Sequence, residues 1–350
     1  MPSPLPIDTA AMLDFLAGLL NTPSPTGFTE RAIVYVRSKF GPLGLIESET
    51  VKGALLLDWP GRASHAPRAL TAHVDTLGAM VKEIRPNGRL KLTKLGGFAW
   101  NTVEGEGCTV FTASGQEVRG SFLVTRASSH IFGAETGDTK RDDDHMEVRL
   151  DARTASAEET RALGIGVGDF VAFDPRVEVG PAGFIRSRHL DDKAAVACIF
   201  GAVKAMLDAG LQPAQRTTLH ISNYEEVGHG AASGFPADLI ELLTVDMAAV
   251  GPGQASDEFS ACICVKDSGG PYHLAMNQKL RHLAEAAGIP YQVDIYPYYG
   301  SDGEAYWRAG GDVRVGLVGP GVDASHNYER THMDSLVRTA QLLAEYLRSE

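Results

Sequence analysis

Two adjacent carboxylates, Glu225 and Glu226, end an apolar run and stand before the glycine-rich turn Val227-Gly-His-Gly230. Neighbouring residues on an extended chain point to opposite sides. One carboxylate can therefore hold a metal ion while the other faces substrate as a base, the division of roles that metal-assisted hydrolysis needs. An adjacent Glu pair is equally typical of a solvated surface turn, so the pair alone leaves both interpretations open.

His73-Val-Asp75 follows an apolar, strand-like segment. In an open α/β sheet, ligand sites gather at the carboxyl ends of strands. We therefore predict that His73 is a metal ligand and that Asp75 orients its ring. The alternative is a strand-end histidine bonded to a backbone group.

Two further carboxylate positions stand at the ends of predicted elements. Asp191-Asp192 begins a predicted helix, where an Asp can be an N-cap or can bridge two cations. Asp246 follows another strand, and an acidic residue is unusual in a buried parallel strand. Near the C-terminus, an irregular loop supplies His326 and His332, of which we expect one to be a ligand.

These candidates form a nitrogen and oxygen ligand set without thiolates: His73, Asp191, Glu225, Glu226, Asp246 and a C-terminal His. Such a set suits zinc, cobalt or manganese. The chain has no His-Glu-x-x-His helix, no Gly-x-Ser-x-Gly elbow and no phosphate-binding Gly-x-x-x-x-Gly-Lys loop. Those absences argue against a helical metalloprotease plan, a serine hydrolase and a nucleotide phosphohydrolase.

Composition limits the class of protein. A chain of 350 residues is too long for most single cores, so we expect two domains. The formal net charge of -12 argues against a nucleic-acid partner. The 4 cysteines are too few for a disulfide framework. The apolar residues 10–20 lack a basic flank, and no apolar stretch reaches the roughly 20 residues that span a bilayer. We expect a cytoplasmic protein with no membrane partner.

The elements that must position the candidates alternate in type. Helical spacing predicts helices at residues 8–20 and 29–40, and strands follow at 54–59 and 68–73. From residue 76 the chain changes to short β-like runs separated by Gly, Asn and Asp turns. After residue 186, strands again alternate with helices, including a short helix at 238–243 and a strand at 245–250.

This alternation predicts an α/β fold, with a mainly parallel sheet covered by helices on both faces. The α/β domain comprises residues 1–75 and 178–350, and a small β domain, PDZ-like or a barrel, is inserted at 76–177. Within the insert, the run Arg141-Asp-Asp-Asp-His145 has the composition of a metal cluster. It lacks the glycine and distal Glu of a calcium loop, so we interpret it as a solvated acidic turn.

Taken in order, the motifs resemble those of the dinuclear-metal aminopeptidases that include glutamyl aminopeptidase, deblocking aminopeptidase and the tetrahedral aminopeptidases, some of them described as cellulase-M-like. The resemblance spans nearly the whole chain. Each motif is short, but their joint order is specific: Met12-Leu-Asp-Phe-Leu16, Pro25-Thr-Gly27, Ala72-His-Val-Asp75, Leu190-Asp-Asp-Lys193, Glu225-Glu-Val-Gly228, Val265-Lys-Asp267 and Gly300-Ser-Asp302.

The resemblance implies a zinc-peptidase-like domain with two divalent metal ions per subunit, either zinc or, alternatively, cobalt or manganese. Asp191 would bridge the two ions. His73 and Asp246 would complete one site, and Glu226 with a C-terminal His would complete the other.

By the same resemblance, Glu225 is the general base, and Asp75 supports His73. The inserted β domain corresponds to a module that mediates assembly in this family. We therefore expect a homo-oligomer, with a dodecamer as one candidate size.

Two positions depart from the family pattern. The bridging Asp is commonly followed by Asn-Arg or Asp-Arg, whereas Asp192-Lys193 follows here. The terminal His is usually followed by Ser/Thr-Pro and then Glu, whereas this chain has His326-Asn-Tyr-Glu329. Counting back from the last helix favours His326 over His332. Both departures lie near the expected place of a substrate side chain, so specificity stays open.

The predicted activity is that of a metal-dependent aminopeptidase. It would hydrolyse the N-terminal bond of short peptides or peptide-like solutes, through a metal-bridging water with Glu225 as general base. Two alternatives stand beside it: a glycoside hydrolase that uses paired carboxylates, and a non-catalytic oligomeric scaffold.

Overall fold

A computed structural model describes residues 3–350, which form two compact units. One unit combines the segment that ends at Asp75 with the segment that starts at Arg176, and the other is Thr76–Pro175. The unit boundaries therefore lie at 75/76 and 175/176, compared with 75/76 and 177/178 in the prediction.

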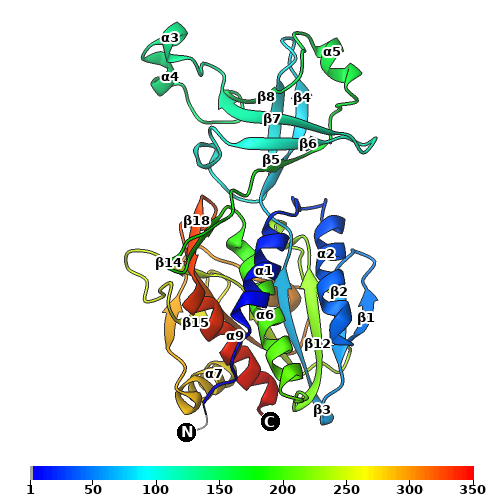
Figure 1. The fold of residues 1–350 in the computed structure, drawn as a ribbon, viewed down its shortest axis with the longest axis vertical. Helices are drawn as coiled ribbons and strands as arrows, with labels where there is room; N and C mark the ends of the chain where they lie inside the picture. Colours follow the sequence, from blue (N-terminus) through cyan, green and yellow to red (C-terminus); the bar gives the residue numbers. More distant parts are fainter. Residues whose placement is uncertain (1–2) are drawn as a thin grey trace. The chain divides into compact units, whose positions relative to one another are not determined.

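The larger unit is built on a 12-stranded sheet (Figure 1). Its strands are β1 (Ile46–Glu49), β2 (Leu55–Trp59), β3 (Ala63–His73), β10 (Glu178–Val179), β11 (Phe184–Ser187), β12 (Gln215–Ser222), β13 (Glu241–Val245), β14 (Ala248–Val250), β15 (Ala261–Lys266), β16 (Tyr291–Ile295), β17 (Arg314–Asp323) and β18 (Glu329–His332). The four central strands, in the order β12-β3-β13-β17, are parallel. The α/β fold class is confirmed, but the flanks differ from the prediction, because β2, β15 and β18 join the centre antiparallel.

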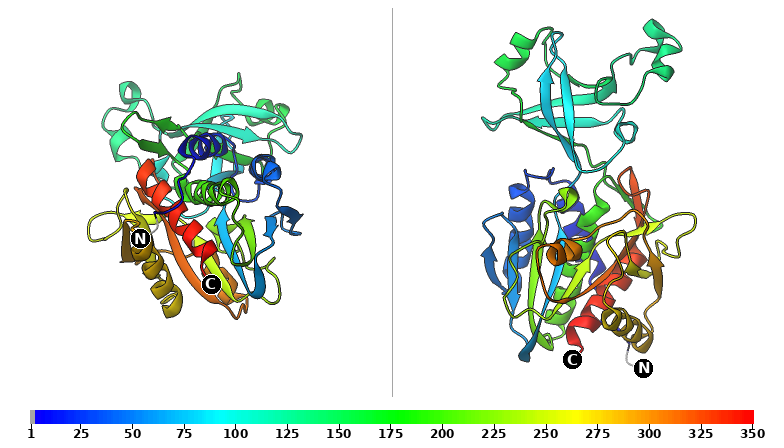
Figure 2. Two further views of the ribbon diagram at one scale, coloured as in Figure 1. Left: turned by 60° about the horizontal axis from the view of Figure 1, so that its bottom comes forward. Right: turned by 180° about the vertical axis from the view of Figure 1, so that it is seen from behind.

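Helices cover both faces of this sheet. They are α1 (Thr9–Leu20), α2 (Glu30–Phe40), α6 (Leu190–Asp208), α7 (Leu274–Ala287), α8 (Asp302–Arg308) and α9 (Met333–Arg348). Helices α1, α6 and α9 lie on one face, and α8 lies on the opposite face, which Figure 2 shows from behind. None of the helices within residues 3–350 is both long enough and apolar enough to cross a membrane.

The central strands are buried on both faces because their alternate residues enter two different cores. Leu70 of β3 and Leu243 of β13 belong to the core beneath α6 and α9. Their chain neighbours Ala69 and Leu242 belong to the core that includes residues of α8. Because these strands are parallel, their carboxyl ends lie at one edge of the sheet.

Three phenylalanines join the helices above the larger core. Phe15 of α1 stacks on Phe200 of α6 with ring centroids 4.6 Å apart, and both rings meet Phe40 of α2 edge-on. The sequence predicts α1 and α2, and Asp8 caps α1 by accepting a hydrogen bond from the backbone N–H of Ala11 at 3.0 Å. This packing joins α1, α2 and α6 in one core.

The smaller unit is a closed antiparallel barrel with the strand order β4-β5-β8-β7-β6-β9. These strands are β4 (Gly78–Ile84), β5 (Leu90–Leu95), β6 (Gly107–Phe111), β7 (Glu117–Val124), β8 (Met146–Leu150) and β9 (Phe170–Phe173), and the short helices α3 (Ser129–Phe132), α4 (Glu135–Asp138) and α5 (Ala157–Ala162) lie between them. Trp100, Phe122 and Phe173 lie in its separate core. Of the two predicted forms of the β domain, the structure has the barrel.

The predicted short helix at 238–243 is wrong. Residues Glu241–Val245 form strand β13, in which every residue is buried between β3 and β17. Hydrogen bonding to two neighbours outweighs the weak local preference of a short apolar run, which periodicity cannot assign to helix or strand. The predicted strand at 245–250 is divided, because the chain leaves the sheet at Asp246 and Met247 before β14.

The acidic run at 141–145 is a hydrogen-bonded turn, as predicted. Asp142 Oδ1 accepts the backbone N–H groups of Asp144 at 3.1 Å and His145 at 3.0 Å. Asp143 accepts the indole N–H of Trp100. These carboxylates are used locally, and they belong to neither group of metal-type ligands found within residues 3–350.

The phenylalanine contact predicts a measurable stability loss. Phe15→Ala should lower the free energy of unfolding by about 3–5 kcal/mol, since it removes a buried ring and leaves a cavity. Val34→Ala on α2 is the control, because Val34 is 52% exposed and its truncation should change stability by less than about 0.5 kcal/mol. Urea denaturation of both variants checks the difference, and equal midpoints would contradict it.

Candidate metal centre

The carboxyl ends of three neighbouring parallel strands carry the central residues. His73 is the last residue of β3, and Asp246 directly follows β13. Strand β12 ends at Ser222, and the following 3-10 turn η3 (Glu225–Val227) holds both glutamates. Because β12, β3 and β13 are adjacent and parallel, their ends bring these side chains to one edge of the sheet.

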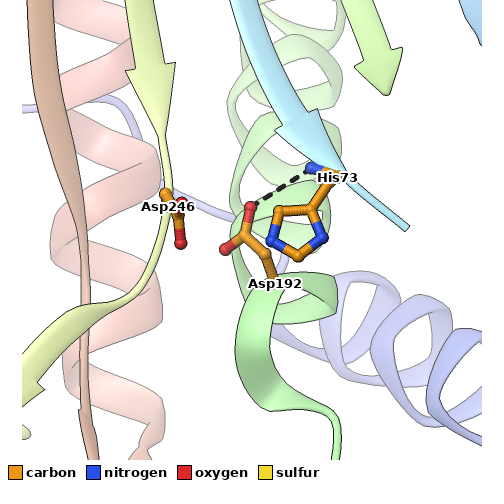
Figure 3. Close-up of side chains that lie close together, drawn as sticks. All are labelled: His73, Asp192 and Asp246. Atoms are coloured by element: carbon orange, nitrogen blue, oxygen red, sulfur yellow. Dashed lines mark hydrogen bonds between the residues drawn. The ribbon is translucent and has the colours of Figure 1, made fainter. Parts of the chain in front are cut away.

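A first triad consists of His73, Asp192 and Asp246, whose ligand atoms all lie within 4.8 Å of one another. Figure 3 shows the two carboxylates facing each other beside the His73 ring. The backbone N–H of His73 donates to Asp192 Oδ2 at 3.3 Å. Asp192 Oδ1 is buried without a hydrogen-bond partner among the described residues. Asp192 was not among the predicted ligands.

A second triad consists of Asp191, Glu226 and His326, again with ligand atoms within 4.8 Å. His326 Nε2 lies 3.3 Å from Asp191 Oδ2 and 3.6 Å from Glu226 Oε2. The other Asp191 oxygen, Oδ1, lies 3.3 Å from His73 Nε2. Asp191, a member of the second triad, therefore also reaches the first triad, with one oxygen towards each histidine.

Glu225 stands beside the triads without belonging to either. Its Oε2 atom lies 3.6 Å from His73 Nε2, and its side chain is 16% exposed. Glu226 is 4% exposed, and its Oε1 atom has no hydrogen-bond partner within the described part of the chain. The adjacent glutamates thus differ in surroundings. Glu226 belongs to the second triad, whereas Glu225 lies beside His73 of the first triad.

Asp75 fixes both the histidine ring and the glutamate turn. The backbone oxygen of Asp75 lies 2.9 Å from His73 Nδ1, which leaves Nε2 facing Asp191. The Asp75 carboxylate accepts the backbone N–H groups of Glu225 at 3.1 Å and Glu226 at 3.3 Å. It also accepts the Thr26 hydroxyl at 2.7 Å. The predicted support of His73 therefore includes the Asp75 backbone as well as its side chain.

The two C-terminal histidines, His326 and His332, have different surroundings. His326 reaches the second triad. His332 instead lies 2.9 Å from the Ala182 backbone oxygen through Nε2 and accepts the Asp334 backbone N–H as the N-cap of α9. His332 is thus occupied in capping a helix.

Glu329, which the sequence reasoning did not assign, connects two residues of the second triad. It is fully buried, and its two oxygens accept the backbone N–H of His326 at 3.0 Å and of Asp191 at 3.1 Å. A Glu three residues after a candidate ligand was the available signal. Its significance depends on α6 and β18 lying side by side, which the sequence does not reveal.

Lys193, at the first departure from the family pattern, is also buried. Its Nζ donates to the backbone oxygens of Leu19 at 3.0 Å and Thr22 at 2.7 Å, at the end of α1. Burial lowers the pKa of the Lys193 amine to about 7. Lys193 therefore joins the end of α1 to the segment that carries Asp191 and Asp192.

Burial makes the carboxylates difficult to ionise together. Burial, with a further contribution from Asp191, raises the pKa of Glu226 to about 8 and that of Asp246 to about 8. Burial also holds the pKa of Glu225 well above its ordinary value. For His73, burial acts to lower the pKa, but hydrogen bonds with Asp191 and Asp75 outweigh it and raise the pKa well above the usual range. Carboxylates outnumber the two histidines in this site, so like charges oppose the ionisation of several carboxylates.

The donor set fits divalent cations. Each triad combines one imidazole nitrogen with carboxylate oxygens, and each contains a buried oxygen without a hydrogen-bond partner in the described chain, Asp192 Oδ1 or Glu226 Oε1. Nitrogen and oxygen donors without thiolate suit zinc, manganese or cobalt. A shared carboxylate between two such triads is suited to metal-assisted hydrolysis.

The model of the family described as M42 glutamyl aminopeptidase matches residues 53–342. The chain belongs to this family. The four cysteines are buried free thiols, so none of them alters the ligand set. As a member of the M42 family, the chain is a hydrolase of the aminopeptidase class.

The similar proteins agree with this assignment. YhfE of Bacillus subtilis (strain 168), named as a candidate aminopeptidase, is 47% identical over 96% of this chain and 97% of its own. The aminopeptidase APDkam598 from the archaeon Desulfurococcus kamchatkensis has a TM-score of 0.87 at 20% identity, over 98% of this chain and 96% of its own. The TET1 peptidase of Pyrococcus horikoshii has a TM-score of 0.84 at 20% identity, over 97% and 100%. These two structures show the shared fold.

The position of Glu329 yields a prediction about metal affinity. Glu329→Gln should weaken cation binding about 10- to 100-fold, because an amide NH₂ would face one of the two backbone N–H groups that hold His326 and Asp191. Calorimetric titration of the chelator-stripped protein with zinc measures this change.

Glu258→Gln is the matched control. Glu258 is a carboxylate that is only 7% exposed, and it forms an ion pair with Arg330, the residue that follows Glu329 in the sequence. It should bind zinc as the unaltered protein does. Unchanged affinity in Glu329→Gln would show that the Glu329 contacts do not organise the ligands.

Proposed function

We propose that the protein is a dinuclear metal-dependent aminopeptidase that hydrolyses the N-terminal bond of short peptides or peptide-like solutes. The observation that carries this proposal is the pair of adjacent triads, with one Asp191 oxygen towards the histidine of each and with Glu225 at their edge. Family membership supplies the aminopeptidase class. The proposal adds the metals, the residues and the role of each.

In this proposal, His73 and Asp246 hold one cation, Glu226 and His326 hold the other, and Asp191 is shared. Asp192, in the first triad, is an additional candidate ligand. Zinc is the first candidate, with cobalt and manganese as alternatives. When bound, two divalent cations lower the pKa of the attacking water and neutralise charge that develops on the substrate carbonyl oxygen.

The protein's own groups manage the proton and the geometry. Glu225 takes a proton from the attacking water and later delivers it to the leaving amine. Its position is held through its backbone N–H by Asp75, which also orients the His73 ring. Burial raises the pKa of Glu225, which suits a group that must both accept and release a proton.

Asp302 supports the same turn from its other side. Its Oδ1 atom accepts the Ala231 backbone N–H at 2.7 Å, and its Oδ2 atom accepts the hydroxyls of Ser222 and of Thr71, the latter at 3.2 Å. A Cβ atom on Gly230 would come within 1.6 Å of Asp302 Oδ1, so this position needs glycine. Residues on both sides of the Glu225–Glu226 pair are thereby anchored to one buried carboxylate.

We also propose a homo-oligomer assembled through the barrel unit. The support is the TET1 peptidase of similar fold, which can assemble into a tetrahedron or a large octahedral shell. A dodecamer is one candidate size. A cytoplasmic location is proposed as well, because the four cysteines are all free thiols, as expected in a reducing compartment.

The role of Glu225 gives the sharpest test of mechanism. Glu225→Gln should retain both cations but lose about 100- to 10,000-fold in kcat on aminoacyl substrates, since it lacks the proton acceptor. Asp191→Ala should lose cation binding as well. Kinetics and elemental analysis of the same preparations check both results, and near-normal turnover by Glu225→Gln would refute its assigned role.

Chelation separates the aminopeptidase from its two rivals. Exhaustive removal of metal should abolish hydrolysis of aminoacyl and blocked dipeptide substrates, and zinc, cobalt or manganese should restore it. A glycoside hydrolase working through paired carboxylates would instead cleave a polysaccharide after chelation. A scaffold would bind no stoichiometric metal and cleave neither substrate class.

A further inference from the structure

Lys52 contacts the segment that carries the two glutamates from a distant part of the chain. It lies in the turn between β1 and β2. Its Nζ atom donates to the backbone oxygens of His229 and Gly230, both at 2.5 Å. Its own backbone oxygen accepts a side-chain amide N–H of Asn223 at 2.8 Å. Lys52 therefore holds the chain both before and after the glutamate pair.

The turn between β1 and β2 fixes the position of Lys52. The backbone N–H of Thr50 donates to the backbone oxygen of Ala54 at 2.9 Å, and the Ala54 N–H donates to Thr50 Oγ1 at 3.0 Å. Strand β2 pairs with β12 so that Leu55 lies opposite Ile221. The start of β2 thus neighbours the end of β12, and this pairing places Lys52 beside the chain that leaves β12.

The chain around η3 has a conformation that needs support from outside. Tyr224 and Gly228, on either side of η3, have left-handed φ angles of 63° and 82°. Such a conformation is strained for a residue with a side chain, and it persists only where surrounding contacts hold it. Inside the turn, the Gly228 N–H donates to the Glu225 backbone oxygen at 2.7 Å, and the His229 N–H donates to the Tyr224 backbone oxygen at 3.0 Å.

The outside contacts divide by chemistry. Asp75 accepts the backbone N–H groups of the two glutamates, and Asp302 accepts the backbone N–H of Ala231. Carboxylates cannot bind the carbonyl oxygens of the same segment, because an ionised carboxylate has no proton to donate. The Lys52 ammonium group has three N–H donors and reaches two of those oxygens. Lys52 thus complements the two aspartates.

We propose that Lys52 is a positioning residue that keeps segment 223–230 closed and thereby holds Glu225 in place for proton transfer. The inference rests on the proposed function, in which Glu225 is the general base. Lys52 would act through the backbone of this segment and not by contact with the reacting atoms. Its loss should therefore lower turnover in protein whose cation sites are full, and should loosen the segment itself.

Steady-state hydrolysis of an aminoacyl substrate by the full-length protein gives the first measurement, with saturating zinc and with the zinc content of each preparation determined. Lys52→Met removes the ammonium group and keeps an unbranched apolar side chain. It should lower kcat about 10- to 100-fold and change KM less than about threefold, because a misplaced base slows the chemical step. Lys52→Arg keeps the charge and N–H donors, so it should restore kcat to within about fivefold.

Amide hydrogen exchange gives a second measurement that needs no turnover. Mass spectrometry of the same zinc-loaded proteins should show about 10-fold faster exchange in the peptide that covers residues 223–231 of Lys52→Met. Exchange in β3 and β13 should stay unchanged, and Lys52→Arg should return the rate of the 223–231 peptide towards that of the unaltered protein.

Lys94→Met is the matched control. Lys94 Nζ also donates to a backbone oxygen, that of Phe98 at 2.6 Å, but both residues belong to the barrel unit. This variant should keep kcat and the exchange rate of residues 223–231. An equal loss of kcat in the Lys52→Met and Lys94→Met variants would reduce the role of Lys52 to general stability and overturn the proposal.

The two measurements must also agree. Unchanged kcat in Lys52→Met, or a lower kcat without faster exchange at 223–231, would overturn the proposal. So would a loss of kcat that follows only from missing zinc, or a thermal unfolding midpoint that collapses in Lys52→Met, since the residue would then serve metal loading or folding. Failure of the proposed function is distinguishable: the unaltered zinc-loaded protein would cleave no peptide substrate, while hydrogen exchange would still decide whether Lys52 closes the segment.

Discussion

The burial of many carboxylates at one edge of the sheet is the constraint on which the candidate metal centre depends. Six carboxylates from four segments of the chain converge there: Asp75, Asp191, Asp192, Glu225, Glu226 and Asp246. Desolvation and mutual repulsion raise the pKa of several of them, and two histidines cannot balance the charge. In the proposed function, bound divalent cations supply the missing positive charge.

The fold meets this constraint with rigid backbone anchors. Parallel strands bring several candidate ligands to one edge, and buried carboxylates fix the irregular segments that carry the remaining candidates. Asp75 holds the glutamate turn, and Glu329 joins the backbones of Asp191 and His326. Because these anchors accept backbone N–H groups, the ligand side chains stay available for cations. Main-chain hydrogen bonds to buried carboxylates therefore determine where the fold places the candidate ligand side chains.

Strong local patterns were sufficient to predict much of the fold. Helical periodicity located α1 and α2, and the change to short β-like runs located the barrel. The predicted short helix at 238–243 was wrong because hydrogen bonds with the neighbouring strands β3 and β17 make β13 a strand. This is a tertiary effect. The antiparallel strands at the flanks of the sheet were not predicted for the same reason, because the direction of a strand depends on pairing between distant segments.

The candidate site divides in a similar way. Polar residues at strand ends could be recognised from the sequence, and the structure brings all of the predicted ligands, with Glu225 and Asp75, to one place. Asp192 and Glu329 could not be assigned, because their importance arises from contacts with residues far away in the chain. Sequence reasoning finds groups that chemistry requires more readily than groups that hold them in position.

The central claim is that two cation sites share Asp191. Anomalous diffraction from crystals of the zinc-loaded protein, recorded on both sides of the zinc absorption edge, tests it most directly. The account predicts two anomalous peaks per chain, one beside His73 and Asp246 and one beside Glu226 and His326, both next to the Asp191 carboxylate. A single peak, peaks elsewhere in the chain, or a pair that does not touch Asp191 would contradict it.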